Sequence, residues 1–386
     1  MRPRLLDYVR ALPEEDLPAY VYDLVALRKH AQAIRAALPA WVEVYYAAKA
    51  NPDARLLAAL RDHVDGFEVA SAGELRHVRE LFPGTPIAFG GPGKTAADLN
   101  YALHAGVQRL HVESVQELHL LATLLGGRTA EILLRVNAPI ATGPAPLVMG
   151  GVPSPFGLDP GDLDHCLHLI AAQPQIRLCG LHLHLASGMD APAQLALAGD
   201  ILAWTSERDL PLSEINIGGG MAVDYNDPDR LFDWRDFGAG LEKILIDHPG
   251  TTLRIEPGRS ISAYCGSYIT RVLDIKRSHG QAFAVLAGGT HHLRTPAARG
   301  HDQPFRTIPI DNWPWPWPRP TATGEPVTLV GQLCTPKDVL ARDVHIERLR
   351  AGDYVAFAMA GAYAWNISHH AFLMHPAPGF HYLDEA

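Results

Sequence analysis

The chain has 386 residues, of which 47% are hydrophobic, and a formal net charge of −9 at pH 7. This length and apolar content fit one large or two ordinary globular domains with a substantial core. An acidic balance without basic blocks argues against nucleic acid or anionic membrane as a partner, and no run approaches the roughly 18 apolar residues of a transmembrane helix.

The N-terminus and the cysteines indicate a cellular location. The first ten residues contain Asp7 and Arg10, which interrupt any continuous apolar signal core. The four cysteines are widely spaced and form neither a metal knuckle nor a disulfide framework. We therefore expect a soluble, cytoplasmic protein.

The first two-thirds of the sequence alternates short apolar strands with helices. The first strand is an apolar run over 42–51 that stops at Asn51-Pro52. Seven further strands are predicted at 65–69, 86–90, 109–113, 131–137, 178–185, 214–217 and 252–256. Helices are predicted at 53–61, 72–81, 96–104, 115–125, 160–172, 193–208 and 234–247. Eight strands that each lead into a helix or crossover predict an α/β fold, a (β/α)8 TIM barrel over residues 25–262.

The pattern changes after about residue 260. Strands without helical periodicity are predicted at 267–276, 281–287, 326–330 and 354–358, and another at 19–22 precedes the barrel. The alternating Trp and Pro residues of 313–320 cannot form a helix and predict a loop or extended connector. These patterns predict a second domain, a β-barrel or sandwich built from residues 1–24 and 263–386.

Lys49 lies at the C-terminal end of the first strand. Burial penalises the charged form of a lysine, and one reason to place it there is chemistry that needs a neutral amine, with Schiff-base formation as the leading case. The alternative is a lysine whose ammonium simply reaches solvent beyond the strand end.

Three more polar groups follow strand ends. Gly218, Gly219 and Gly220 can form a backbone nest for a phosphate, or merely a flexible turn, and they lack the spacing of a dinucleotide fingerprint. Glu256 can pair with a protonated ring nitrogen and Arg259 with a phosphate, unless this segment only forms a structural ion pair.

His182 and His184 alternate with apolar residues, so they are expected to face the same side of one strand. Two histidines on one face could bind a metal, but no third ligand at a short spacing accompanies them, and we predict no metal site. A histidine stacked on an aromatic cofactor, with Ser187 reaching its phosphate, fits the neighbouring motifs better.

Taken together, these motifs resemble the alanine-racemase-like, fold type III pyridoxal phosphate enzymes, and within them the ornithine/diaminopimelate decarboxylase family. The resemblance covers nearly the whole chain, and its motifs occur in family order at 46–51, 67–71, 184–187, 218–220, 256–259, 331–334 and 361–363. No single motif would be specific, but the ordered set is.

The resemblance implies pyridoxal 5'-phosphate as cofactor and a role for each matching residue. Lys49 would bind the cofactor covalently, His184 would stack on its ring, Glu256 would keep the ring nitrogen protonated, and Cys334 would donate a proton. Cys334 would come from the partner subunit of a homodimer with shared active sites. The remaining cofactor-binding set is Glu68, Arg135, Ser187, Gly218, Gly219, Gly220, Gly258, Arg259 and Tyr363.

The departures from the family narrow the substrate. Ornithine and diaminopimelate decarboxylases have an acidic residue after the catalytic cysteine, whereas Thr335 follows Cys334 here. The segment 286–301 instead carries histidines and arginines where the family lines its substrate pocket. This resembles the siderophore-biosynthesis branch (staphyloferrin B or vibrioferrin type), whose substrate is an amino acid joined to citrate, a small-molecule polycarboxylate. The expected substrate-binding residues are His291, His292, Arg294, Arg299, Thr335 and Asp338, unless the basic segment is only a solvated loop.

Three other functions remain open. A decarboxylase of diaminopimelate or of a basic amino acid such as ornithine or lysine is disfavoured by Thr335. A racemase would carry a tyrosine in place of the cysteine segment. A non-catalytic, single-barrel pyridoxal phosphate carrier would lack both the β domain and Cys334.

Overall fold

The computed structural model describes residues 3–208, 210 and 212–385. Its contacts group the chain into two compact units. One comprises Arg28–Ala222 and Leu231–Ile261, and the other comprises Met1–Leu27, Val223–Arg230 and Ser262–Ala386. The domain boundaries expected from the sequence stay a prediction, and the two units are described separately.

The larger unit is a closed barrel of eight parallel strands, as predicted. Around the barrel the strands follow the order β10-β11-β2-β3-β4-β5-β6-β8. Their bounds are Val42–Ala47 (β2), Gly66–Val69 (β3), Ile87–Phe89 (β4), Arg109–Val112 (β5), Ala130–Arg135 (β6), Ile176–His182 (β8), Glu214–Asn216 (β10) and Thr252–Ile255 (β11). The short antiparallel pair of β7 (Leu147–Val148) and β9 (Ala186–Ser187) forms a separate two-stranded sheet.

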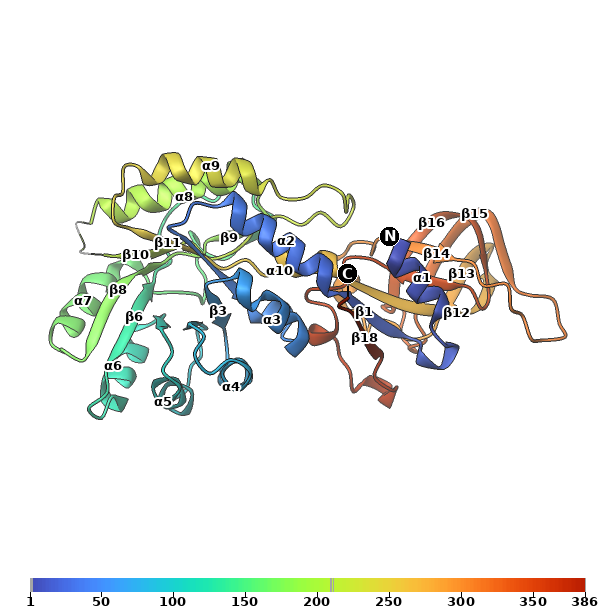
Figure 1. Ribbon diagram of the computed structural model, residues 1–386, viewed down its shortest axis with the longest axis horizontal. Coiled ribbons are helices and arrows are strands. Elements are labelled where there is room, and N and C mark those ends of the chain that lie inside the picture. Colours follow the sequence, from blue (N-terminus) through green and yellow to red (C-terminus); the bar gives the residue numbers. More distant parts are fainter. Residues whose placement is uncertain (1–2, 209, 211, 386) are drawn as a thin grey trace. The chain divides into compact units, whose positions relative to one another are not determined.

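Helices follow the barrel strands and surround them (Figure 1). Side-chain oxygens of Asp53, Ser71, Thr95, Ser114 and Asp190 accept backbone N–H groups at helix starts, which satisfies donors that a helix leaves free. The helices are Leu24–Ala37 (α2), Ala54–Leu60 (α3), Ala72–Leu81 (α4), Ala96–Ala105 (α5), Val115–Leu124 (α6), Leu163–Ala171 (α7), Ala191–Ser206 (α8) and Trp234–Leu245 (α9).

An ion-pair cluster fills the barrel interior away from the strands' C-terminal ends. Arg254 is 1% exposed, stacks over the Tyr45 ring at 4.0 Å, and pairs with Glu43 and Glu214 at 2.6 Å each. Arg109 also pairs with Glu214, at 2.8 Å. Buried guanidinium groups that are paired with carboxylates escape most of the cost of desolvation. A structural ion pair within residues 254–259 was one of the two interpretations of the sequence. Arg254 does form ion pairs, but with Glu43 and Glu214 and not with Glu256.

The other unit is an eight-stranded mixed sheet that includes the N-terminal strand, as predicted. Its main path is β14-β17-β12-β13-β15-β16, and β1 pairs with both β12 and β18. The bounds are Ala19–Asp23 (β1), Gly266–Ser278 (β12), Gln281–Leu286 (β13), Phe305–Ile308 (β14), Thr321–Val330 (β15), Val339–Arg350 (β16), Tyr354–Phe357 (β17) and Gly379–Leu383 (β18). Helices Pro3–Ala11 (α1) and Thr295–Arg299 (α11) belong to this unit, and the chain passes from one unit to the other within Arg259–Ser262 (α10).

A β-bulge and an apolar cluster hold this sheet together. The register of β12 shifts between Val272 and Asp274, so its first half pairs with β1 and β17 and its second half with β13. Val21, Ile269 and Leu383, from three different strands, are each at most 5% exposed and share one buried cluster. Within the described residues, no helix has both the length and the apolar character to span a membrane.

Candidate active site

The site residues gather at the C-terminal ends of the barrel strands. Lys49 lies just after β2, in the short 3₁₀ helix Ala48–Ala50, and its Nζ is 2.5 Å from Glu68 Oε2 at the end of β3. The Lys49 side chain is 44% exposed, whereas that of Glu68 is only 6% exposed. The expectation of a buried lysine is therefore wrong, because Lys49 lies in a 3₁₀ helix beyond the strand, is partly exposed and pairs with a carboxylate.

Glu256 follows β11 and is approached by polar side chains from three other strands of the barrel, β5, β8 and β10. Asn216 donates a hydrogen bond of 2.7 Å to its Oε1. His111 Nε2 lies 3.8 Å and His182 Nε2 3.6 Å from its two carboxylate oxygens. Burial, with the Glu68 carboxylate adding to it, raises the pKa of Glu256 to about 7. A cation close to this carboxyl group would stabilise its ionised form.

His111, His182 and Glu256 also have the geometry of a possible metal site. Their ligand atoms all lie within 4.8 Å of one another, and the ring nitrogens of both histidines make no hydrogen bond to the described residues. Burial and nearby cations, which include Arg135 and Lys49, hold the pKa values of both histidines well below their usual range. Both imidazoles are therefore neutral at pH 7, and with Asn216 they form a polar pocket around the Glu256 carboxyl group.

The three glycines pass between two strand ends with no room for side chains. A Cβ at Gly219 would lie 2.4 Å from the Glu256 carbonyl oxygen, and one at Gly220 would lie 2.4 Å from the Ala186 carbonyl oxygen. The Gly220 carbonyl in turn accepts hydrogen bonds from the backbone N–H groups of Gly188 and Met189. This close approach brings the glycine loop against the segment that contains Ser187, as a phosphate cradle requires.

His184 is held against the same loop. A Cβ on Gly218, whose φ is +71°, would lie 2.4 Å from Nδ1 of the His184 ring. Burial, with the charges of Arg135 and Lys49, lowers the pKa of His184 to about 3, so its imidazole is neutral at pH 7. His184 lies beyond the end of β8, and it is His182 that approaches Glu256. The two histidines therefore serve different parts of the site, contrary to the expectation of one shared strand face.

A charged network that no sequence motif marks supports Arg135. The Arg135 guanidinium donates to Glu113 at 3.0 Å, and Glu113 also accepts the backbone N–H groups of Gly91 and Gly157. Glu117 accepts the Glu113 backbone N–H and pairs with Lys94 at 2.8 Å. No motif marks Lys94 or Glu117 in the sequence, because their burial follows from how the loops after β4 and β5 fold together.

The remaining cofactor residues predicted from the sequence lie in different places. Gly258 packs close to Ala50, beside Lys49, since a Cβ there would lie 2.8 Å from the Ala50 Cβ. Arg259 begins helix α10 directly after it. Tyr363 belongs to the β unit, has φ +49°, and its carbonyl accepts a 2.5 Å hydrogen bond from Thr295 Oγ1.

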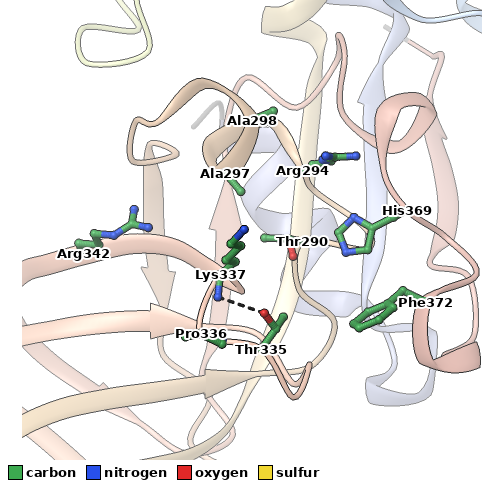
Figure 2. A pocket seen from close by; sticks show the side chains of 10 residues that line it. All are labelled: Thr290, Arg294, Ala297, Ala298, Thr335, Pro336, Lys337, Arg342, His369 and Phe372. Atoms are coloured by element: carbon green, nitrogen blue, oxygen red, sulfur yellow. Dashed lines mark hydrogen bonds between the residues drawn. The ribbon is translucent and has the colours of Figure 1, made fainter.

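The segment that carries Cys334 borders a cavity of about 600 Å³ in the β unit (Figure 2). Cys334 itself is exposed, and Thr335 is among the lining residues. None of the described residues that line this cavity is an aspartate or glutamate. They are Thr290, Arg294, Ala297, Ala298, Thr335, Pro336, Lys337, Arg342, His369 and Phe372.

Of the six expected substrate residues, only Arg294 and Thr335 line this cavity. His291 and His292 are at most 2% exposed, and His292 uses both ring nitrogens on Tyr268 Oη and the Pro376 carbonyl. The Arg299 guanidinium lies over the Tyr225 ring at 5.7 Å.

Asp338 lies behind the cavity wall. Its carboxylate is buried and accepts the backbone N–H groups of Thr290, at 2.6 Å, and Leu333, at 2.8 Å. It thereby ties together the two loops that line the cavity. Lys337, Arg342 and His369 also line the cavity and were not among the residues predicted from the sequence, in which no motif marks them.

Known proteins match nearly the whole chain. It is 41% identical over 375 residues to the 2-((L-alanin-3-ylcarbamoyl)methyl)-2-hydroxybutanedioate decarboxylase of Staphylococcus aureus, covering 95% of this chain and 94% of that protein. It is 31% identical to the L-glutamyl-(BtrI acyl-carrier protein) decarboxylase of Niallia circulans, covering 94% and 88%. Diaminopimelate decarboxylase from Helicobacter pylori, crystallised with L-lysine, shares the fold with a TM-score of 0.80 at 24% identity, covering 95% and 91%.

Residues 24–263 match the pyridoxal-binding domain of the pyridoxal-dependent decarboxylases. The site geometry fits that cofactor, because it offers an amine, closely packed glycines beside a strand end, a neutral imidazole, and a buried carboxyl group that can accept the N–H of a protonated ring. The chain therefore belongs to the pyridoxal-dependent decarboxylases of fold type III, and it is a pyridoxal phosphate-dependent decarboxylase.

Proposed function

We propose that this enzyme removes carbon dioxide from an α-amino acid joined through an amide to citrate, in the assembly of a carboxylate siderophore. The observation that carries the proposal is the cavity beside Cys334, which offers three permanent cations, on Arg294, Lys337 and Arg342, and no carboxylate among its described lining residues. A substrate with a distal ammonium would meet like charge there, whereas an anionic distal group would be paired.

The most similar of the relatives compared above supports this substrate class. Its named substrate is a 2-hydroxybutanedioate with a CH₂–CO–NH arm to carbon 3 of alanine, which is the citryl amide of 2,3-diaminopropionate. We extend that substrate to this chain, with the carboxylate beside the free amine as the group that leaves.

We assign the following residues to the cofactor. Lys49 binds it covalently, and Glu68 at 2.5 Å holds the free amine in place beforehand. Gly218 to Gly220, Ser187, Arg259 and Tyr363 bind the phosphate. His184 stacks against the ring, and Arg135 approaches its ring oxygen.

When bound, pyridoxal phosphate accepts the electron pair that remains on the substrate carbon after the bond to the carboxylate breaks and carbon dioxide leaves. The part of the protein is to keep the ring nitrogen protonated. Glu256 lies where it can accept that N–H, with Asn216 orienting the carboxylate from Oε1. Because its neighbours His111 and His182 stay neutral at pH 7, they do not compete with the ring nitrogen as cations for Glu256.

We further propose a homodimer with shared active sites, in which Cys334 of one subunit donates a proton at the site of the other. Cys334 is exposed on the β unit, as such a role requires. The four free cysteines are consistent with a cytoplasmic location, which we also propose.

Two measurements test this function. Borohydride reduction of the cofactor-loaded protein should fix the label on Lys49, and a Lys49→Ala variant should lose the visible absorption band that a Lys337→Met control keeps. Carbon dioxide release should then be measured with the citryl amide of 2,3-diaminopropionate, diaminopimelate, lysine and ornithine. Faster turnover of diaminopimelate than of the citryl amide would reject the substrate and restore the ordinary decarboxylase as the function.

A further inference from the structure

Two buried imidazoles lie next to Glu256 with ring nitrogens that make no hydrogen bond to the described residues. His111 is 0% exposed and His182 is 4% exposed, and both nitrogens of each ring lack such a bond. The ring centroids are 4.3 Å apart, so the two imidazoles pack against each other. Buried polar groups are nearly always hydrogen-bonded, and this pair therefore needs an acceptor.

The Glu256 carboxyl group is the acceptor that the geometry offers. His111 Nε2 lies 3.8 Å from Oε1, and His182 Nε2 lies 3.6 Å from Oε2. Each gap exceeds an N–H···O hydrogen bond by less than about 1 Å, so a small movement of the side chains closes it. A neutral imidazole carries one proton, and a nitrogen lone pair would be repelled by an ionised carboxylate. When Glu256 is ionised, the proton of each ring therefore belongs on Nε2.

The backbones of these groups are held by other parts of the barrel. The Glu256 N–H donates to the Gly218 carbonyl at 2.8 Å, and the Gly218 N–H donates to Asn216 Oδ1 at 2.9 Å. The His111 carbonyl accepts a 2.8 Å hydrogen bond from Lys94. The movement that brings the imidazoles to the carboxylate is therefore left to the side chains.

The hydrogen-bonding capacity of the carboxylate leaves one position for the cofactor. Its two oxygens can accept about four hydrogen bonds in total. Asn216 already donates to Oε1 at 2.7 Å, and the His111 N–H takes the second position on that oxygen. On Oε2 the His182 N–H takes one position, and the other is left for the N–H of a protonated pyridine ring.

We propose that His111 and His182 are positioning residues for Glu256, whose Nε2–H groups donate to its ionised carboxylate and orient Oε2 toward the ring nitrogen of the cofactor. Hydrogen bonds to the charged form of a buried carboxyl group favour that form. A carboxylate that stays ionised in turn keeps the ring nitrogen protonated. This inference rests on the proposed role of Glu256.

Nitrogen-15 NMR of the enzyme loaded with pyridoxal phosphate labelled at the ring nitrogen tests the proposal, because protonation moves that signal strongly. Wild type should give the signal of a protonated ring at pH 7. The double variant His111→Leu with His182→Leu keeps the two side chains apolar and similar in size but removes both donors. Its signal should move toward that of the neutral ring, and its kcat should fall about tenfold or more with a much smaller change in KM.

Glutamine variants separate hydrogen bonding from packing. The side-chain Nε2 of glutamine can take the place of a histidine Nε2 as donor, so His111→Gln with His182→Gln should keep the protonated signal and recover most of the lost kcat. Thr205→Val is the control for loss of a buried hydrogen bond elsewhere, because Thr205 donates within helix α8 to the Ile201 carbonyl. It should leave both the signal and kcat at their wild-type values.

The histidine ring signals of the wild-type enzyme give a measurement that needs no variant. Both rings should carry their proton on Nε2 in the cofactor-loaded enzyme, and a proton on Nδ1 of either ring would refute the proposal.

Glu256→Gln distinguishes failure of this inference from failure of the proposed role of Glu256. If Glu256→Gln leaves the ring-nitrogen signal unchanged, the proposed role of Glu256 is wrong. If Glu256→Gln loses the protonated signal but the leucine double variant keeps it, the role of Glu256 stands and the positioning role of the histidines is wrong. Equal losses in the leucine and glutamine variants would show that packing, and not hydrogen bonding, is what the two histidines provide.

Discussion

The ammonium of Lys94 lies 2.8 Å from the carboxylate of Glu117, and the two side chains are only 2% and 7% exposed. Lys94 also donates to the carbonyls of Gly91 and His111, at 2.6 and 2.8 Å. Through Glu117 and then Glu113, the pair reaches Arg135. The loops after β4 and β5 are thus held by a buried ion pair one step behind the cofactor site.

Lys94→Met should destabilise the protein by about 3–5 kcal/mol, since it leaves the Glu117 carboxylate buried and uncompensated. The double variant Lys94→Met with Glu117→Gln should recover a large part of that loss, because it removes both charges. Urea unfolding of the cofactor-free proteins measures both free energies. Equal destabilisation by the single and double variants would show that packing, and not charge, dominates here.

A comparison of Lys94 with Lys49 shows how far the burial of a lysine can be predicted from the sequence. Lys49 follows a continuous apolar strand, and the prediction of chemistry there began from its supposed burial. In the structure Lys49 is 44% exposed and Lys94 is the buried one. The sequence alone does not show which of the two lysines is buried, because Lys94 binds the carbonyl of Gly91 in the loop after β4 and that of His111 in β5. The cofactor role of Lys49 therefore rests on the ordered set of motifs.

Glu256 should make the cofactor-free protein less stable as the pH rises. Burial raises its folded pKa to about 7, above the ordinary value of 4.5. Below about pH 4.5 both states hold the proton; between about 4.5 and 7 the folded state holds it and the unfolded state releases it, so stability falls with rising pH across that window.

Urea unfolding at a series of pH values should show this loss, about 1–3 kcal/mol for one group, in wild type and not in Glu256→Gln. The same variant should still bind pyridoxal phosphate through the phosphate contacts yet lose most decarboxylation. A pH slope that survives in Glu256→Gln would assign the proton to another buried acid, such as Glu117.

Gly219→Ala tests the cradle with the smallest possible change. Its Cβ would lie 2.4 Å from the Glu256 carbonyl oxygen, so the loop or the end of β11 must move. We expect roughly tenfold or greater weakening of cofactor binding, consistent with overpacking costs of about 1–3 kcal/mol. Gly93→Ala is the matched control, because nothing lies within 4 Å of its added Cβ. Fluorescence titration with pyridoxal phosphate compares them, and equal affinities would remove the steric argument.

The barrel was easier to predict than the β unit for a physical reason. Parallel strands that are buried on both faces read as apolar runs, and all eight appear in the sequence at the right places. The 12-residue strand β16 was missed because Arg342, Asp343 and several later residues face solvent and interrupt its apolar pattern. The approach of His111 to Glu256 could not be predicted either, because the two residues are 145 positions apart and come together only when the barrel closes.

Mixing two inactive variants of the enzyme tests whether the active sites are shared between subunits. Lys49→Ala lacks the amine for the cofactor, and Cys334→Ala lacks the proposed proton donor. If each site takes Lys49 from one subunit and Cys334 from the other, random exchange places both variants together in half of the dimers. One of the two sites in each mixed dimer is then intact, so activity should recover to roughly a quarter of wild type. Subunit exchange should be verified independently with differently tagged chains, and exchange without recovered activity would place both residues in the site of a single chain.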